Sequence, residues 1–278
     1  MTPARAFAAW ALLLIAAAAP AAAAPARVVS MNLCTDQLAM LLAAPGQLVS
    51  VTWLAQDPSA SAMAEEAAAF PANRGFAEEI FLLQPDLVIA GAFTTRATVD
   101  MLRRLDVPVV EFAPAASFDE VRDRVRQMGA ALGRETEAEQ LVARFDADLA
   151  AARPSDLRRP RAASWQANGW TAGPDTLAGA VIDAAGLANV AEELGLSQGG
   201  ALPLERLVTA APDLIVTGRP RPAPSLAEEA FSHPAMAALR RTAGAAPVAD
   251  RHWICGTPFI VEAVRRLAAA RAAVLEPR

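Results

Sequence analysis

The sequence contains two copies of one pattern, and this repeat limits the folds open to the chain. The first copy runs from Glu78 to Gly91 and the second from Glu205 to Gly218. Each has a glutamate seven residues before a Pro-Asp pair, then a run of aliphatic residues, then a glycine. Proline ends a helix and aspartate favours a turn, so each copy predicts a helix, a turn and a buried strand. A single Pro-Asp turn is common, but two copies with the same upstream glutamate indicate two similar lobes.

Expected strands and helices alternate along both halves of the chain. This order predicts parallel sheets covered by helices on both faces, so the expected fold class is α/β with two Rossmann-like lobes. In the first half we expect strands over 27–31, 48–52, 86–91 and 108–112, and helices over 35–42, 78–83 and 98–105. In the second half we expect strands over 162–166, 213–218 and 246–249, and helices over 177–185, 205–210, 234–242 and 257–275.

The alternation is interrupted from about Ser117 to Ala152, where hydrophobic residues recur at helical spacing. We expect a single long backbone helix that joins the lobes. Gly129 and Gly133 weaken its middle, so a bend or a division into two helices is also open. The expected boundaries are 27–115 for the N-terminal lobe, 116–153 for the linking helix and 160–278 for the C-terminal lobe.

The N-terminus has the pattern of a secretory signal peptide over residues 1–24. Arg5 supplies the positive charge, Phe7–Ala19 the hydrophobic core, and the small residues up to Ala24 a cleavage site. The alternative is an uncleaved membrane anchor. No later segment approaches the roughly 20 apolar residues of a membrane span. We therefore expect an exported protein that resides in the periplasm.

The charge of the chain argues against a nucleic-acid partner. Its formal net charge is −5, whereas proteins that bind nucleic acid usually carry a basic face. Two enzyme signatures are also missing, because the sequence has no Walker A loop and no dinucleotide-binding glycine pattern.

Aromatic residues cluster at the expected carboxyl ends of strands, where open α/β sheets bind ligands. Four of the five tryptophans of the chain lie there, although it has no tyrosine. Tryptophan is often a core residue, but rigid apolar walls also suit a flat macrocycle or chelate. The expected ligand-contacting residues are Asn32, Trp53, Phe93, Trp165, Trp170, Arg251, His252 and Trp253.

The two cysteines, Cys34 and Cys255, also follow strands. Three interpretations are open: small buried residues, a disulfide across the lobes, or cleft thiols that bind a soft metal or react with ligand. With only two histidines, a His-rich zinc site is excluded, and the identity of any bound metal is left unknown. His252 could ligate a metal centre or hydrogen-bond a carboxylate.

From about Arg27 to Leu275 the sequence resembles the periplasmic substrate-binding proteins of ABC importers for vitamin B12, ferric siderophores and haem. Segment 74–91 carries the most specific likeness, with further support from 199–218 and 253–264. The resemblance implies a ligand that is an iron or cobalt chelate, no intrinsic cofactor, and no enzyme activity. It also implies a monomer that delivers its ligand to a permease and an ATPase in the inner membrane.

The resemblance assigns roles to individual residues. Glu78 and Glu205 match the surface glutamates that dock on the permease, one on each lobe. Trp53 and Trp170 match aromatic ligand contacts of cobalamin binders, whereas Arg251–Cys255 departs from the polar stretch that those proteins have there. The alternatives from other classes are an exported α/β enzyme, or a sensor that uses the same cleft to signal to a membrane receptor.

Overall fold

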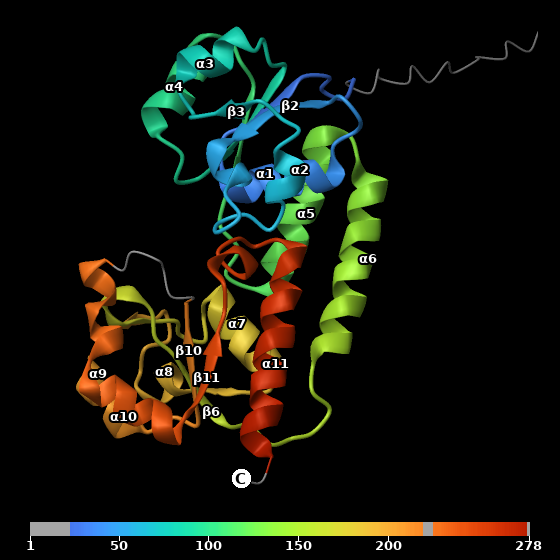
Figure 1. Cartoon of the computed structure of the whole chain (residues 1–278). Coiled ribbons are helices and arrows are strands. Elements are labelled where there is room, and N and C mark those ends of the chain that lie inside the picture. The colour runs from blue at the N-terminus through green and yellow to red at the C-terminus, as the bar shows by residue number, and fades with distance from the viewer. Residues whose placement is uncertain (1–22, 219–224, 277–278) are drawn as a thin grey trace, which may run out of the picture.

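The chain folds into two α/β lobes that lie one above the other and are joined by a pair of long helices (Figure 1). This computed structural model describes residues 23–218 and 225–276. The predicted signal peptide over 1–24 lies almost wholly outside the described residues. Within the described ranges, no helix is long and apolar enough to cross a membrane.

The N-terminal lobe is built on a five-stranded parallel sheet of order β3-β2-β1-β4-β5. Successive residues of a strand point to opposite faces. Ile89 therefore packs with α1, α5 and α6 on one face, and Val88 with α3 and α4 on the other. The elements are β1 (Val28–Ser30), α1 (Leu33–Leu42), β2 (Leu48–Thr52), α2 (Ala64–Ala67), β3 (Ala72–Asn73), α3 (Ala77–Leu82), β4 (Leu87–Gly91), α4 (Arg96–Arg104) and β5 (Val109–Phe112).

The C-terminal lobe repeats this plan with a four-stranded parallel sheet of order β11-β10-β6-β8. Val216 packs with α7 and α11 on one face, and Ile215 with α9 and α10 on the other. A small antiparallel pair, β7–β9, is added beside it. The elements are β6 (Arg161–Ser164), β7 (Trp170–Thr171), α7 (Leu177–Ala184), β8 (Ala188–Asn189), α8 (Val190–Glu193), β9 (Gly200–Ala201), α9 (Leu204–Ala210), β10 (Leu214–Thr217), α10 (Pro234–Thr242), β11 (Gly244–Pro247) and α11 (Val261–Leu275).

The two copies of the sequence repeat occupy corresponding places in the lobes. The first forms α3 and β4, and the second forms α9 and β10. In each sheet the repeat strand lies next to the first strand of the lobe, β1 or β6. The residue before each proline, Gln84 or Ala211, adopts a positive φ that ends the helix. The prediction of two similar lobes with parallel sheets is thus confirmed.

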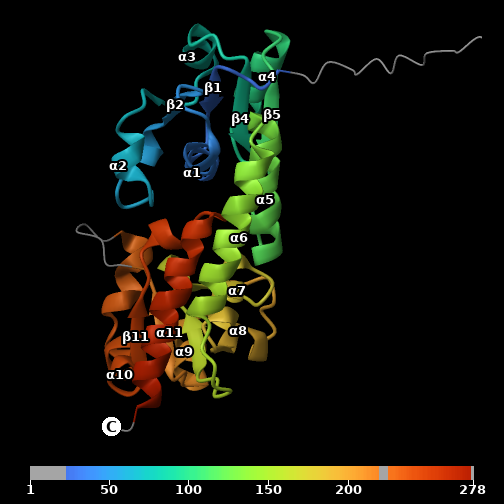
Figure 2. The ribbon, with the colours of Figure 1, turned by 90° about the vertical axis from the view of Figure 1, so that its right-hand side faces the viewer.

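The expected single linking helix is instead two antiparallel helices, α5 (Phe118–Leu132) and α6 (Glu135–Ala152) (Figure 2). The chain reverses at Gly133, whose φ of 68° is a left-handed conformation that glycine adopts without strain. Gly129 allows the helices to approach closely, because a Cβ there would lie 2.4 Å from the Cβ of Ala138. Each helix contributes to the hydrophobic cores of both lobes, so the pair forms a stiff connection.

Candidate ligand-binding site

Both sheets have a topological switch point. This is the place where the strand order reverses, because later strands are added on both sides of the first strand of the lobe. In the N-terminal lobe this point lies between β1 and β4, and in the C-terminal lobe between β6 and β10. Ligands of open α/β sheets bind in the crevice outside the carboxyl ends of the strands at such points. The segments that follow these strands are therefore the first place to look for a site.

Three large aromatic side chains in these segments are exposed. Trp53 directly follows β2, Phe93 follows β4 by two residues, and Trp170 forms the start of β7 after β6. Their exposed fractions are 52% for Trp53, 88% for Phe93 and 52% for Trp170. Exposed aromatic side chains at the ends of these strands are available to contact a flat apolar ligand. The sequence predicted all three as ligand contacts, and the structure leaves them accessible.

Trp165 differs from the expectation for a ligand contact. Its side chain is only 2% exposed and belongs to the core of the C-terminal lobe. The indole Nε1–H donates to the carbonyl oxygen of Leu202 at 2.9 Å, and the ring packs edge-on against Phe231 with centroids 5.1 Å apart. The side chain is thus satisfied inside the lobe, and we leave it out of the candidate site.

A segment of the C-terminal lobe reaches over to the N-terminal lobe. We call Asp250–Thr257, which follows β11, the strap. Cys255 of the strap forms a disulfide with Cys34 at the start of α1, with Cα atoms 5.1 Å apart. Of the three interpretations of these cysteines, the structure therefore has the disulfide. Cys255 is 3% exposed and packs with the core of the N-terminal lobe.

The other predicted residues of the strap are Arg251, His252 and Trp253. Arg251 Nη1 donates to the carbonyl oxygen of Pro58 at 3.0 Å. His252 Nε2 accepts a hydrogen bond from Arg251 Nε at 3.4 Å, which favours a polar role for this imidazole over metal ligation. Trp253 is partly buried against the core of the C-terminal lobe. Ile254 was not predicted, yet 57% of it is exposed.

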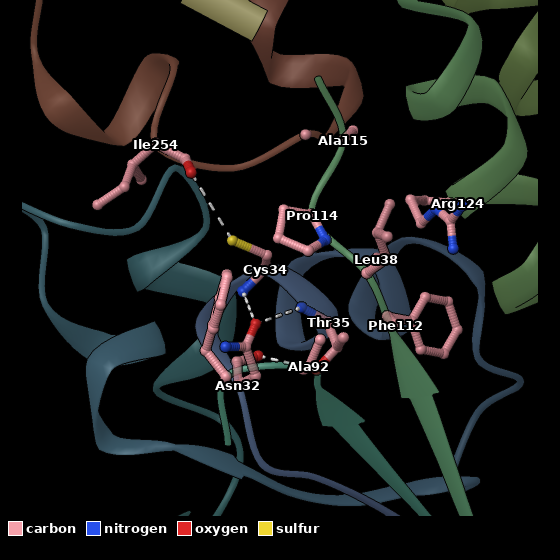
Figure 3. A pocket seen from close by; sticks show the side chains of 14 residues that line it. Asn32, Cys34, Thr35, Leu38, Ala92, Phe112, Pro114, Ala115, Arg124 and Ile254 are labelled. Atoms are coloured by element: carbon pink, nitrogen blue, oxygen red, sulfur yellow. Dashed lines mark hydrogen bonds between the residues drawn. The ribbon is translucent and has the colours of Figure 1, made fainter. Parts of the chain in front are cut away.

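A pocket of about 230 Å³ lies at the switch point of the N-terminal lobe, between that lobe and the strap (Figure 3). Asn32 lines it, but its Oδ1 accepts the backbone N–H of Cys34 at 3.0 Å and caps α1. Arg124 of α5 contributes a guanidinium that the sequence analysis did not single out. The lining residues are Asn32, Cys34, Thr35, Leu38, Gly91–Phe93, Phe112–Ala115, Arg124, Ile254 and Gly256.

A second hollow of about 640 Å³ also lies between the lobes and carries more charge. Arg251 and His252 line it from the strap, and α2 lines it from the N-terminal lobe. Both acidic and basic groups line it, among them the ion pair of Arg265 with Asp148 at 2.9 Å. Its other lining residues are Leu41, Pro58, Ser61, Ala62, Ala64–Glu66, Leu141, Pro258, Phe259, Val261 and Glu262.

The described residues contain no group of three or more His, Cys, Asp or Glu side chains that could hold a metal ion. Both sulfurs are bonded to each other and are no longer soft ligands.

Asp36 is a buried titratable group beside the site. It lies on α1, two residues after Cys34, and its Oδ2 accepts from Thr52 N at 3.1 Å and from Thr52 Oγ1 at 2.5 Å. Burial raises the pKa of Asp36 to about 7, against the opposing effect of hydrogen bonds from Thr52 and Ser30. Because Trp53 directly follows Thr52, this carboxyl group fixes the start of α1 to the turn that presents Trp53.

Glu78 and Glu205 occupy equivalent exposed positions in the two lobes. Glu78 is in the first turn of α3 and Glu205 in the first turn of α9, where a carboxylate is favoured by the helix dipole. On the same face, at i+3, each is followed by an exposed apolar residue, Phe81 or Val208. Each lobe therefore presents one carboxylate beside an apolar side chain.

Comparisons with known proteins place this architecture in context. A family model described as periplasmic binding protein matches residues 28–246. A cobalamin-binding protein of Halobacterium salinarum is 32% identical over 203 residues, which are 70% of this chain and 54% of that protein. The chain spans about half the length of the curated relatives it matches. The family consists of binding proteins and not of enzymes.

Solved structures share the two-lobed fold. The periplasmic haem-binding protein RhuT from Roseiflexus sp. RS-1 matches with a TM-score of 0.73 at 24% identity, over 90% of this chain and 99% of that one. The periplasmic vitamin B12 binding protein BtuF of Vibrio cholerae matches with a TM-score of 0.66 at 17% identity, over 91% of this chain and 99% of that one. At these identities the likeness concerns the fold.

Proposed function

Because the chain belongs to the periplasmic binding protein family, we propose that it is the substrate-binding component of an ABC importer and holds its ligand between the two lobes. It works in the periplasm after removal of residues 1–24, as a monomer, and hands the ligand to a permease driven by an ATPase. The observation that carries this proposal is the pair of half-exposed tryptophans, Trp53 and Trp170. They belong to different lobes: Trp53 directly follows β2, and Trp170 begins β7, after β6.

The ligand we propose is a metal chelate or corrinoid: haem, cobalamin or a ferric siderophore. Flat or rigid apolar ligands gain most from aromatic walls such as Trp53, Trp170 and Phe93. The lack of a cation site among the described residues supports a metal that arrives already chelated. Relatives and structural neighbours named for cobalamin, haem and hydroxamate-bound iron support the same class.

Permease docking is proposed for Glu78 and Glu205. Two exposed carboxylates, one on each lobe, match a pair of basic groups only at one separation, so the permease can recognise the arrangement of the lobes. Phe81 and Val208 add apolar contact beside each carboxylate.

The proposal of a chelate ligand is tested by the visible spectrum of the protein purified from its native periplasm, and by titration. Haemin, cyanocobalamin and a ferric hydroxamate each absorb visible light, and each should quench tryptophan fluorescence if it binds at the site. We expect one of them to saturate at micromolar concentration or below, whereas free Fe³⁺ and Co²⁺ should not. If none of the chelates binds in that range, the proposed ligand class is wrong.

A further inference from the structure

The pocket at the switch point of the N-terminal lobe has a single charged group in its lining. That group is the guanidinium of Arg124, and no carboxylate is among the lining residues. Most of the other walls are apolar, and Figure 3 draws Leu38 and Phe112 on the same side of the pocket as Arg124. A charge beside apolar walls is unfavourable unless a partner compensates it. An anion that enters this pocket would meet a positive charge with no competing acid.

The acidic side chains near Arg124 are engaged in other contacts. Glu120, one turn earlier on α5, accepts the backbone N–H of Ala116 at 2.6 Å. Glu111, on the neighbouring β5, pairs with Arg103 at 2.6 Å. Within the described ranges, Arg124 itself makes no ion pair. Its charge is therefore left for a partner from outside the chain.

One edge of the Arg124 guanidinium is without partners. Nη1 donates to Oε1 of Gln127 at 2.6 Å, and Nε2 of Gln127 donates to the backbone carbonyl of Glu111 at 3.0 Å, so Gln127 fixes the guanidinium to the end of β5. Nε is buried and unpaired, and Nη2 has no partner among the described residues. The N–H bonds of Nε and Nη2 form the fork that matches the two oxygens of a carboxylate.

The pocket reaches the surface that we propose to contact the chelate. Phe93, which is 88% exposed and is one of the candidate aromatic walls, also lines the pocket, and so does the exposed Ile254 of the strap. Asn32 lines it too, and its Nδ2 has no partner among the described residues. A volume of about 230 Å³ holds a short side arm of a ligand, whereas a whole drug-sized ligand needs roughly 300–1,000 Å³.

We propose that this pocket is a subsite for a carboxylate on a short alkyl arm of the transported chelate, with Arg124 as its partner. The carboxylate accepts from Nη2 and, after a small rotation of the side chain, from Nε, while the alkyl arm lies against Leu38 and Phe112. A single carboxylate matches the single positive charge of the lining, whereas a phosphate dianion would lack a second cation. This inference rests on the proposed function and narrows its ligand class to chelates that carry a free acid.

The first test concerns the pocket alone and uses pentanoate, with neutral pentanamide for comparison. The Nε–H signal of Arg124 is followed by nuclear magnetic resonance in protein whose arginines carry isotopic nitrogen, and the spectrum of Arg124→Gln assigns it. We expect pentanoate to shift this signal in a saturable way and pentanamide to leave it in place. No shift with pentanoate would overturn the proposal, whichever chelate the protein binds.

The second test asks whether the carboxylate belongs to the chelate. The affinity for haemin is compared with that for its dimethyl ester, and the affinity for cyanocobalamin with that for its monocarboxylic acid, obtained by hydrolysis of one amide. In the chelate that binds, the acid form should bind about tenfold more tightly than the neutral form, because the neutral form loses hydrogen bonds to a charged group. Arg124→Gln should bind both forms alike. The matched control, Arg126→Gln, replaces an exposed arginine of the same helix and should keep the preference.

The outcomes separate this subsite from the proposed function. A preference for the acid that survives Arg124→Gln, or its absence in the wild type, would overturn the assignment of the arm to the chelate; a pentanoate shift would then indicate a site for a free alkyl carboxylate. If neither chelate binds, the proposed function fails, while the pentanoate titration still decides whether Arg124 is an anion site. If Arg124→Gln does not fold, Arg124→Lys keeps the charge without the fork and should bind the acid more weakly than the wild type.

Discussion

The carboxylate of Asp86 accepts the backbone N–H of Arg27 at 2.9 Å, and the Arg27 guanidinium donates to the carbonyl oxygen of Leu83 at 2.8 Å. The same pair of hydrogen bonds recurs in the other lobe. Asp213 accepts from the backbone N–H of Arg161 at 2.8 Å, and Arg161 donates to the carbonyl oxygen of Ala210, also at 2.8 Å. The aspartate of each repeat thus holds the beginning of the first strand of its lobe, while the arginine at or just before the start of that strand satisfies the end of the repeat helix.

These paired contacts predict matched losses of stability. Asp86→Ala and Asp213→Ala should each lower the free energy of unfolding by about 1–2 kcal/mol, because each removes hydrogen bonds made by a charged group. Urea denaturation followed by circular dichroism measures the change. Asp100→Ala, at an exposed position of α4, is the control. Losses no larger than that of the control would mean that the repeat aspartates are not structural.

The buried carboxyl of Asp36 predicts a dependence of stability on pH. In the folded protein burial raises its pKa to about 7, whereas the ordinary value is 3.8. Between these values the folded state holds a proton that the unfolded state has released, so the free energy of unfolding falls as pH rises through this window. The slope from this one group is at most about 1.4 kcal/mol per pH unit.

Asp36→Asn removes this group while keeping an oxygen that can accept from Thr52. Relative to the wild type, the variant should gain stability steadily from about pH 4 to about pH 7, and the difference should level off above that pH. Chemical denaturation at several pH values measures this difference, with Asp100→Asn as the exposed control. A difference that does not change with pH would show that Asp36 ionises normally in the folded protein.

The docking proposal predicts that transport and binding can be separated. The Glu78→Gln/Glu205→Gln variant should lose most uptake of the transported chelate, because two charges facing the permease are gone, while its ligand affinity should equal that of the wild type. Uptake in cells and affinity of the purified protein are the two measurements. Asp100→Asn/Glu192→Gln removes the same charge from other exposed helix positions and should transport normally. Weakened ligand affinity in the docking variant would contradict the assigned role.

The sequence predicted the architecture well because the fold rests on local patterns. The Pro-Asp turns and the alternation of strands and helices are fixed by neighbouring residues, and they located both lobes and the exposed Trp53 and Trp170. The division of the expected linking helix was harder to predict. It depends on the left-handed conformation of Gly133, and a glycine within a helical pattern can also continue the helix.

Features that depend on distant parts of the chain could not be settled from the sequence. A disulfide was one of three open interpretations of Cys34 and Cys255, because these residues are 221 residues apart and their pairing depends on the position of the strap over α1. Trp165 follows a strand just as the exposed aromatics do, yet the carbonyl of Leu202 lies where its indole can be satisfied inside the lobe. Asp36 looks like an ordinary polar residue of the first helical turn, and its pKa is raised by complete burial in the folded lobe, which the sequence does not reveal.

The most direct test of a ligand held between the lobes compares Trp53→Ala with Trp170→Ala. Each removes an aromatic side chain from a different lobe, and ligand affinity is followed by the visible absorbance of the bound chelate. We predict that each variant binds about tenfold more weakly or worse, as for a central contact of an interface, while the exposed control Leu157→Ala binds normally. Weakening by only one of the two tryptophans, or by neither, would contradict a ligand enclosed by both lobes.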